Sequence, residues 1–206
     1  QESARLLLSN AERVARLVAN FRQLAVDRVG EERRPFDLRA CVDDTLRDLQ
    51  PRLDEAGVAL HVDVPAGIAM DSYPVALAQV LTNLAVNALQ HAFAPGQPGS
   101  IEISARLGDD DGVHLVFSDD GRGIDAALRS RVFEPFFTTR RMLGGTGLGL
   151  YIVNQLVTRQ LGGTIVLEAG AGRGARFAIG LPRVARRAPE MTHLLANPPR
   201  ADADGR

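Results

Sequence analysis

Tryptophan is absent from this sequence of 206 residues, and aromatic residues make up only 5% of it. So few aromatic side chains argue against a platform on which nucleic-acid bases stack. The single cysteine, Cys41, excludes an internal disulfide and fits a reducing compartment. We interpret Cys41 as a small buried apolar residue.

The sequence also lacks an excess of charge of either sign and any long apolar run. Its formal net charge is -1, so nothing in it favours nucleic acid or an anionic membrane as a partner. No apolar stretch approaches the roughly 20 residues of a membrane-spanning helix, and no signal peptide is visible. The chain opens on Gln1 and not on methionine. We therefore expect a cytoplasmic fragment of something longer, with membrane anchoring of the parent protein left open.

Residues 1–30 predict one long helix with a narrow apolar seam, the pattern of a coiled coil or helical bundle. The seam residues alternate at spacings of four and three: Leu7, Ala11, Val14, Val18, Phe21 and Ala25. One helix cannot bury such a seam alone, so the partner is an upstream helix, a second copy of the chain or the following domain. After it we expect a polar linker over 31–36, a domain over 37–182 and a disordered tail over 183–206, where periodicity is lost.

Within the expected domain, helical and strand patterns alternate. Asp37 is expected to cap a helix that Pro51 interrupts, and a longer helix is predicted to start within 71–74 and to end at His91. A third helix should end near Leu161. Alternating apolar residues predict strands over 58–64, 101–106, 113–117, 164–168 and 175–181.

Three segments carry residues that call for a ligand. Asn83, Asn87 and His91 share one face of the predicted helix, where asparagine is locally unfavourable. A ligand or cation would explain this row, and a solvated polar face is the alternative.

The second segment is a strand end at Asp119 and Asp120, followed by Gly121 and Gly123, which is typical of a ligand-binding corner. One carboxylate accepting a hydrogen bond from a ligand amino group is favoured over a metal pair, because adjacent side chains at a strand end diverge. The third is the run GGTGLGL over 144–150, where a glycine loop enters a helix. Such a loop binds phosphate through backbone N–H groups, and a plain glycine-assisted turn is the alternative.

Four segments now stand in a fixed order: Asn83-x-x-x-Asn87, Asp119-x-Gly121-x-Gly123, FEPFF over 133–137, and Gly145-x-Gly147-x-Gly149. Together they resemble the N, G1, F and G2 boxes of bacterial sensor histidine kinases, in their catalytic ATP-binding domain (HATPase_c, of the GHKL group). The resemblance covers about residues 36–181. The first thirty residues resemble the second helix of the dimerisation and histidine-phosphotransfer hairpin.

The resemblance implies the Bergerat fold, an α/β (α+β) two-layer sandwich whose mixed sheet is faced by helices, with ATP and Mg²⁺ as cofactors. It implies that Asp119 accepts a hydrogen bond from the adenine amino group and that Asn87 holds Mg²⁺. Asn83 and Arg140 would be the catalytic residues. Arg140 would reach the γ-phosphate from a lid over 137–146. Phe136 and Phe137 would anchor this lid. The other expected ATP contacts are His91, Gly121, Gly123, Ile124, Phe136, Thr139, Gly145, Thr146, Gly147, Leu148, Gly149 and Leu150.

The implied partners are ATP, a response-regulator receiver domain, and a second copy of the chain through the N-terminal helical bundle. Two departures from the family stand out. Gln90 occupies a position that often carries a basic residue, and Arg140 is the hypothetical substitute. The phospho-acceptor of the family is a histidine followed by an acidic residue, with a proline a few positions on. That neighbourhood is missing at all four histidines (His61, His91, His114 and His193), so we expect the acceptor ahead of Gln1.

The leading interpretation is therefore a histidine kinase core that transfers the γ-phosphoryl group of ATP to a protein histidine. An anti-sigma-type serine kinase, a chaperone-like or topoisomerase-like ATPase and a degenerate ATP-binding dimerisation scaffold are the alternatives. Related ATPases carry a water-activating glutamate where this chain has Asn83. Loss of a general base slows water attack by roughly 10²–10⁴-fold, which argues against the ATPase.

Overall fold

The computed structural model describes residues 32–94, 96–109, 111–139, 145–168 and 174–185. The expected helix over 1–30 lies outside this part of the chain. The helices are α2 (Leu38–Arg47), α3 (Gln50–Ala56), α4 (Pro74–His91) and α5 (Gly149–Gln155), with a 3₁₀ helix η1 (Ala126–Arg131) and a π-helical turn η3 (Leu156–Gln160). The strands are β1 (Arg34–Asp37), β2 (Val58–Asp63), β3 (Ala69–Ser72), β4 (Gly99–Leu107), β5 (Gly112–Asp119), β6 (Thr164–Leu167) and β7 (Arg176–Pro182).

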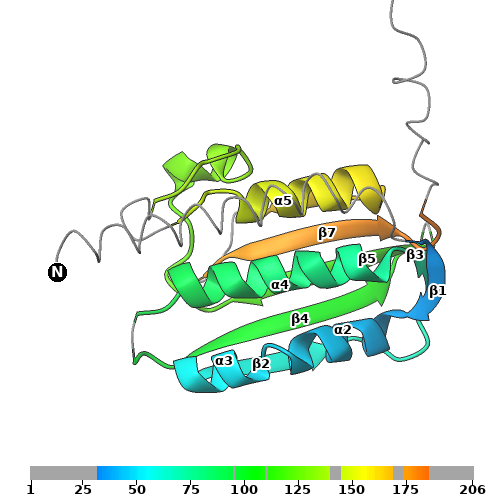
Figure 1. Cartoon of the computed structure of the whole chain (residues 1–206), viewed down its shortest axis with the longest axis horizontal. Helices are drawn as coiled ribbons and strands as arrows, with labels where there is room; N and C mark the ends of the chain where they lie inside the picture. The colour runs from blue at the N-terminus through cyan, green and yellow to red at the C-terminus, as the bar shows by residue number, and fades with distance from the viewer. Residues whose placement is uncertain (1–31, 95, 110, 140–144, 169–173, 186–206) are drawn as a thin grey trace, which may run out of the picture.

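Five strands form a mixed sheet in the order β2-β4-β5-β7-β6. β2 runs parallel to β4, and the other neighbours are antiparallel. The helices α2, α4 and α5 lie over one face of this sheet (Figure 1). Within β5, Val113 and Leu115 are buried while His114 between them is exposed, as a strand covered on one face requires. The two-layer sandwich expected from the sequence is confirmed.

The helix α4 lies in the middle of the helical layer, in contact with both α2 and α5. Leu77, Leu81 and Leu84 are at most 1% exposed and form its core-facing stripe. Each such side chain stabilises the fold by roughly 1.5–3 kcal/mol through burial. Pro74 at the first turn costs little, because the N–H that it lacks has no partner within a helix. The predicted end at His91 is confirmed, and the helix begins at Pro74, because Asp71 and Ser72 of the predicted start belong to β3. The polar face of α4 does not take part in this apolar stripe.

Two expected boundaries differ from the structure. The linker expected over 31–36 overlaps β1, which pairs antiparallel with β3, a strand that sequence patterns did not reveal. Both strands have only four residues, too few for a readable alternation.

The expected tail also begins too early, because residues 183–185 are bound to β3. The Asp71 N–H donates to the Arg183 carbonyl oxygen at 2.7 Å, and the Ala185 N–H donates to the Asp71 carbonyl oxygen at 2.9 Å. Arg33 reaches across the same corner: its guanidinium contacts both Asp71 carboxylate oxygens at 2.9 and 2.6 Å and the Ala185 carbonyl oxygen at 2.7 Å. These long-range contacts order segments whose local sequence resembles a loop.

Within the described ranges, no helix combines the length and the apolar character needed to cross a membrane.

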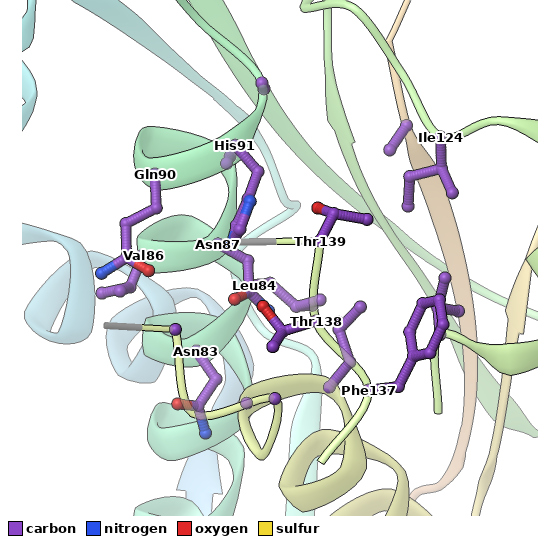
Figure 2. A pocket seen from close by; sticks show the side chains of 18 of the residues that line it. Asn83, Leu84, Val86, Asn87, Gln90, His91, Ile124, Phe137, Thr138 and Thr139 are labelled. Carbon is purple, nitrogen blue, oxygen red and sulfur yellow. The ribbon is translucent and has the colours of Figure 1, made fainter. Parts of the chain in front are cut away.

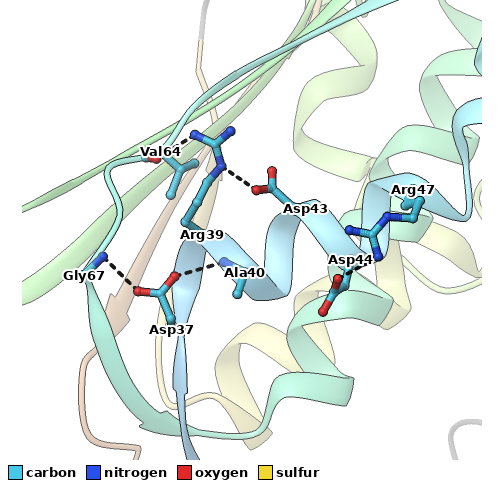
Figure 3. A network of polar contacts seen from close by, with 8 residues as sticks. All are labelled: Asp37, Arg39, Ala40, Asp43, Asp44, Arg47, Val64 and Gly67. Atoms are coloured by element: carbon cyan, nitrogen blue, oxygen red, sulfur yellow. Dashed lines mark hydrogen bonds and ion pairs between the residues drawn. The ribbon is translucent and has the colours of Figure 1, made fainter.

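Asp37 caps α2, as predicted, and also binds a distant turn (Figure 3). One carboxylate oxygen accepts from the Ala40 N–H and the other from the Gly67 N–H, both at 2.9 Å. One side chain therefore fixes the start of α2 relative to the turn before β3.

We expect Asp37→Ala to lower the free energy of unfolding by about 1–2 kcal/mol, because two backbone N–H groups lose their acceptor. Urea unfolding measures the change. The matched control is Asp44→Ala in the same helix, which removes an ion pair to Arg47 whose side chains are 71% and 73% exposed. That control should cost less than about 0.5 kcal/mol. Equal losses in the two variants would contradict the role given to Asp37.

Candidate functional site

A cavity of about 940 Å³ opens between α4, the loop after β5, the FEPFF segment and the glycine loop before α5 (Figure 2). Twelve of the predicted site residues line it: Asn83, Asn87, His91, Asp119, Gly123, Ile124, Thr139, Gly145, Thr146, Gly147, Gly149 and Leu150. Segments that are far apart in the sequence thus meet around one space.

The other predicted residues are placed differently. Arg140 lies outside the described residues. Leu148 is 3% exposed and Phe136 is 59% exposed, and neither lines the cavity. Gly121 does not line the cavity either, and a Cβ there would overlap the Ala92 carbonyl oxygen at the end of α4. For Gly121 and Phe136 the structure therefore supports a role in backbone geometry and not the predicted direct contact.

Sequence reasoning missed several lining residues, among them Arg122, Leu128, Val132, Ala175 and Phe177. It also missed Gly174, whose φ is +93°. A Cβ at Gly174 would overlap the Asp119 carbonyl oxygen, so only glycine fits there. The spacing Gly170-x-Gly172-x-Gly174 just before a predicted strand was the available signal.

The Asp119 side chain is 8% exposed and lies at the end of β5. Its Oδ1 accepts from the Gly121 N–H at 3.0 Å and from the Ala175 N–H at 3.2 Å. Among the described residues, Oδ2 has no hydrogen-bond partner, so it is available to a ligand. Burial raises the pKa of Asp119, and the two N–H donors oppose that rise only in part. Asp120 is exposed and accepts instead from the Ser100 N–H at 2.6 Å.

The polar face of α4 carries unpaired groups. Figure 2 shows Asn83, Asn87 and His91 following one another along α4, with Thr138 and Thr139 lying next to this row. The Nδ2 atoms of Asn83 and Asn87 are buried without a hydrogen-bond partner in the described part of the chain. Because buried polar groups are almost always paired, two orphaned amides in one cavity indicate an absent ligand.

The glycine loop lies directly against the FEPFF segment. Gly147 has a φ of +68°, and a Cβ there would overlap the backbone of Phe136. A Cβ at Gly149 would stand 3.2 Å from Oδ1 of Asn87, a close approach. Glycine at these positions lets the loop lie against both α4 and the FEPFF segment.

The sequence pattern of the histidine kinase-, DNA gyrase B- and HSP90-like ATPase family, HATPase_c, matches residues 72–185. The chain belongs to this family. The matched range contains every cavity-lining segment described above.

Individual relatives of this HATPase_c chain agree with the match. The sensor histidine kinase ZraS of Escherichia coli K12 is 32% identical over 191 residues, which cover 91% of this chain and 39% of ZraS. The chain therefore spans well under half the length of this curated relative. The histidine kinase AdeS of Acinetobacter baumannii has the same fold, with a TM-score of 0.68, 26% identity and coverage of 87% of this chain and 83% of AdeS. Histidine kinase ThkA, in a complex with response regulator protein TrrA, shares the fold at a TM-score of 0.68 and 20% identity, over 84% of this chain and 49% of ThkA.

The HATPase_c family uses ATP, and the cavity has the groups that this nucleotide requires. It combines an acceptor for an amino group, orphaned amides and a glycine loop. The predicted sensor histidine kinase resemblance is confirmed.

We expect Asp119→Asn to stabilise the ATP-free chain at pH 7. Asparagine keeps the Oδ1 acceptor for the Gly121 and Ala175 N–H groups and removes a buried charge. Because the pKa of Asp119 is raised in the folded chain, its carboxyl contributes stability that is complete below the unfolded pKa and is lost as pH rises through the folded pKa.

The variant should therefore unfold at a higher temperature than the native chain at pH 7, and the difference should vanish towards the ordinary aspartate pKa of about 3.9. Thermal unfolding at several pH values measures it, with Asp120→Asn, at an exposed carboxylate, as the control. A gain that persists unchanged in acid would show that the buried charge is not its cause.

Proposed function

We propose that this chain is the catalytic ATP-binding part of a sensor histidine kinase. It transfers the γ-phosphoryl group of ATP to a histidine of a protein, for relay to a response regulator. The observation that carries the proposal is one cavity that contains the buried Asp119 carboxylate, the orphaned amides of Asn83 and Asn87 and the glycine loop.

At the base end, Oδ2 of Asp119 accepts a hydrogen bond from the exocyclic amino group of adenine. Guanine carries an acceptor oxygen at that position, which the carboxylate would repel. Ile124 and Phe177 line the same cavity and offer apolar contact to a purine ring. This arrangement supports ATP over GTP as the donor.

At the phosphate end, the α4 amides and the loop of residues 145–149 receive the triphosphate. Among the described residues, no group of three His, Cys, Asp or Glu side chains is placed to hold a metal ion alone. The Asn87 amide oxygen, beside Gly149, suits a Mg²⁺ ion that takes its other ligands from phosphate and water, as this ion commonly does. Bound Mg²⁺ would neutralise charge on the transferring phosphoryl group.

Transfer to a protein is favoured over hydrolysis because, among the described residues that line the cavity, no carboxylate stands free beside the orphaned amides. Its two carboxylates in the described part of the chain are Asp119, held by two N–H groups, and Asp125, whose Oδ1 accepts from the Ala127 N–H at 2.9 Å at the start of η1. Asn83 occupies the place of a water-activating glutamate and cannot take a proton. Positioning of donor and acceptor then supplies most of the rate.

The remaining assignments extend this proposal. Arg140 would reach the γ-phosphate and replace the basic residue missing at Gln90, which is exposed at the rim of the cavity. Residues 1–30 would be part of the dimerisation helix, the acceptor histidine would lie outside this chain, and the protein would act in the cytoplasm. A receiver domain is the proposed downstream partner, in line with the ThkA–TrrA complex.

The test is labelling with γ-labelled ATP and Mg²⁺. This chain is mixed with a longer protein of the same sequence that carries the upstream helix and has its own Asn87 disabled. Acid-labile, base-stable label on the longer partner is the expected result. Acid-stable label would favour a serine kinase, steady phosphate release an ATPase, and ATP binding without label a scaffold.

We expect Asn87→Asp to reduce this labelling by about 10²-fold or more, because it places a negative charge beside the triphosphate. The control is Asn154→Asp on α5, which does not line the cavity and should label as the native chain does. Unfolding curves check that both variants are folded. Labelling that survives Asn87→Asp would refute the assignment of the phosphate end.

A further inference from the structure

An exposed cation covers a ring that lines the nucleotide cavity. The guanidinium carbon of Arg131 lies 4.6 Å from the centroid of the Phe137 ring. Phe137 lines the cavity, whereas Arg131 is not among the residues that line it. The position of Arg131 can therefore affect a bound nucleotide through the ring.

Arg131 is held over that ring by its neighbours. Its Nε lies 3.1 Å from Oε2 of Glu134. The Glu134 N–H donates to the Arg131 carbonyl oxygen at 2.9 Å, and the Phe137 N–H donates to the Glu134 carbonyl oxygen at 3.4 Å. Arg131, Glu134 and Phe137 thus form one compact unit, which we call the arginine clamp.

The clamp adjoins a strained residue. Phe136 has a φ of +64°, a left-handed conformation that costs a non-glycine residue roughly 1–2 kcal/mol. Such strain persists only where the surroundings impose it. The clamp residues Glu134 and Phe137 flank Phe136 in the chain, and Gly147 of the glycine loop packs on the backbone of Phe136. The same contacts that hold Phe136 therefore connect the clamp to the phosphate loop.

We propose that Arg131 is a positioning residue for the nucleotide. It holds Phe137 at the cavity wall and, through the backbone of Phe136, sets the position of the glycine loop at Gly147. The inference rests on the proposed nucleotide site. All 24 basic residues of this chain are arginine, and a planar guanidinium stacks on a ring face in a way that an ammonium group does not.

The test is a double-mutant cycle on the affinity for MgATP. Arg131→Ala should raise the Kd about two- to fivefold, the range expected for loss of an exposed cation–π contact. In a Phe137→Leu background the same change should have no further effect, and in a Phe137→Tyr background it should keep its full effect. Arg131→Lys should restore part of the affinity.

Two alternatives predict other results. If Arg131 only pairs with Glu134, then Glu134→Gln, which leaves the guanidinium over the ring, should weaken binding as much as Arg131→Ala does. If Arg131 attracts the triphosphate by its charge, its removal should matter equally in the Phe137→Leu background and should lose its effect in high salt. Either outcome overturns the proposal.

Urea unfolding of each variant separates positioning from stability: loss of these exposed contacts should lower the unfolding midpoint only slightly, so that every variant stays fully folded under the conditions of the binding assay. If the native chain binds no ATP, the proposed function itself is refuted. Native binding together with unaltered binding by Arg131→Ala would defeat only the role of Arg131.

Discussion

The nucleotide cavity depends on one buried carboxylate. Asp119 ends β5, and a single oxygen accepts N–H groups from the loop that follows and from Ala175 just before β7. Those two bonds tie the ends of neighbouring strands together and leave the second oxygen for a ligand. Gly174 lets the backbone of the incoming strand approach the Asp119 carbonyl closely. Burial of the ionised carboxylate is unfavourable, and it raises the pKa of Asp119.

Features that are unfavourable to folding, namely unpaired buried polar atoms and a strained backbone, occur around this cavity. Three buried side-chain polar atoms lack a partner in the described part of the chain, and two of them belong to Asn83 and Asn87. The strained Phe136 adjoins the glycine loop. In the packed helical layer, by contrast, Leu77 and Leu81 are fully buried. Such locally unfavourable features are expected at a functional site, where a bound ligand supplies the missing contacts.

Sequence patterns predicted the elements whose periodicity runs long enough to be read. The helix α4 and the strands β4 and β5 followed from apolar repeats, and Asp37 followed from cap chemistry. The strands β1 and β3 were missed because their stability comes from pairing and from Arg33 on Asp71, contacts that local sequence does not encode. Twelve of the residues that line the cavity were predicted from motif spacing. The backbone roles of Gly121 and Gly174 were not, because they depend on approaches between distant segments.

The corner at Asp71 has a mechanical consequence. Arg33 and Ala185, near the two ends of the domain, bind the same residue, so segments attached at either end pull on one point. That corner adjoins the start of α4, near the Gly112 end of β5, whereas Asp119 lies at the other end of that strand, about 23 Å away. The two ends of the domain therefore meet at one residue, a full strand length from the carboxylate on which the cavity depends.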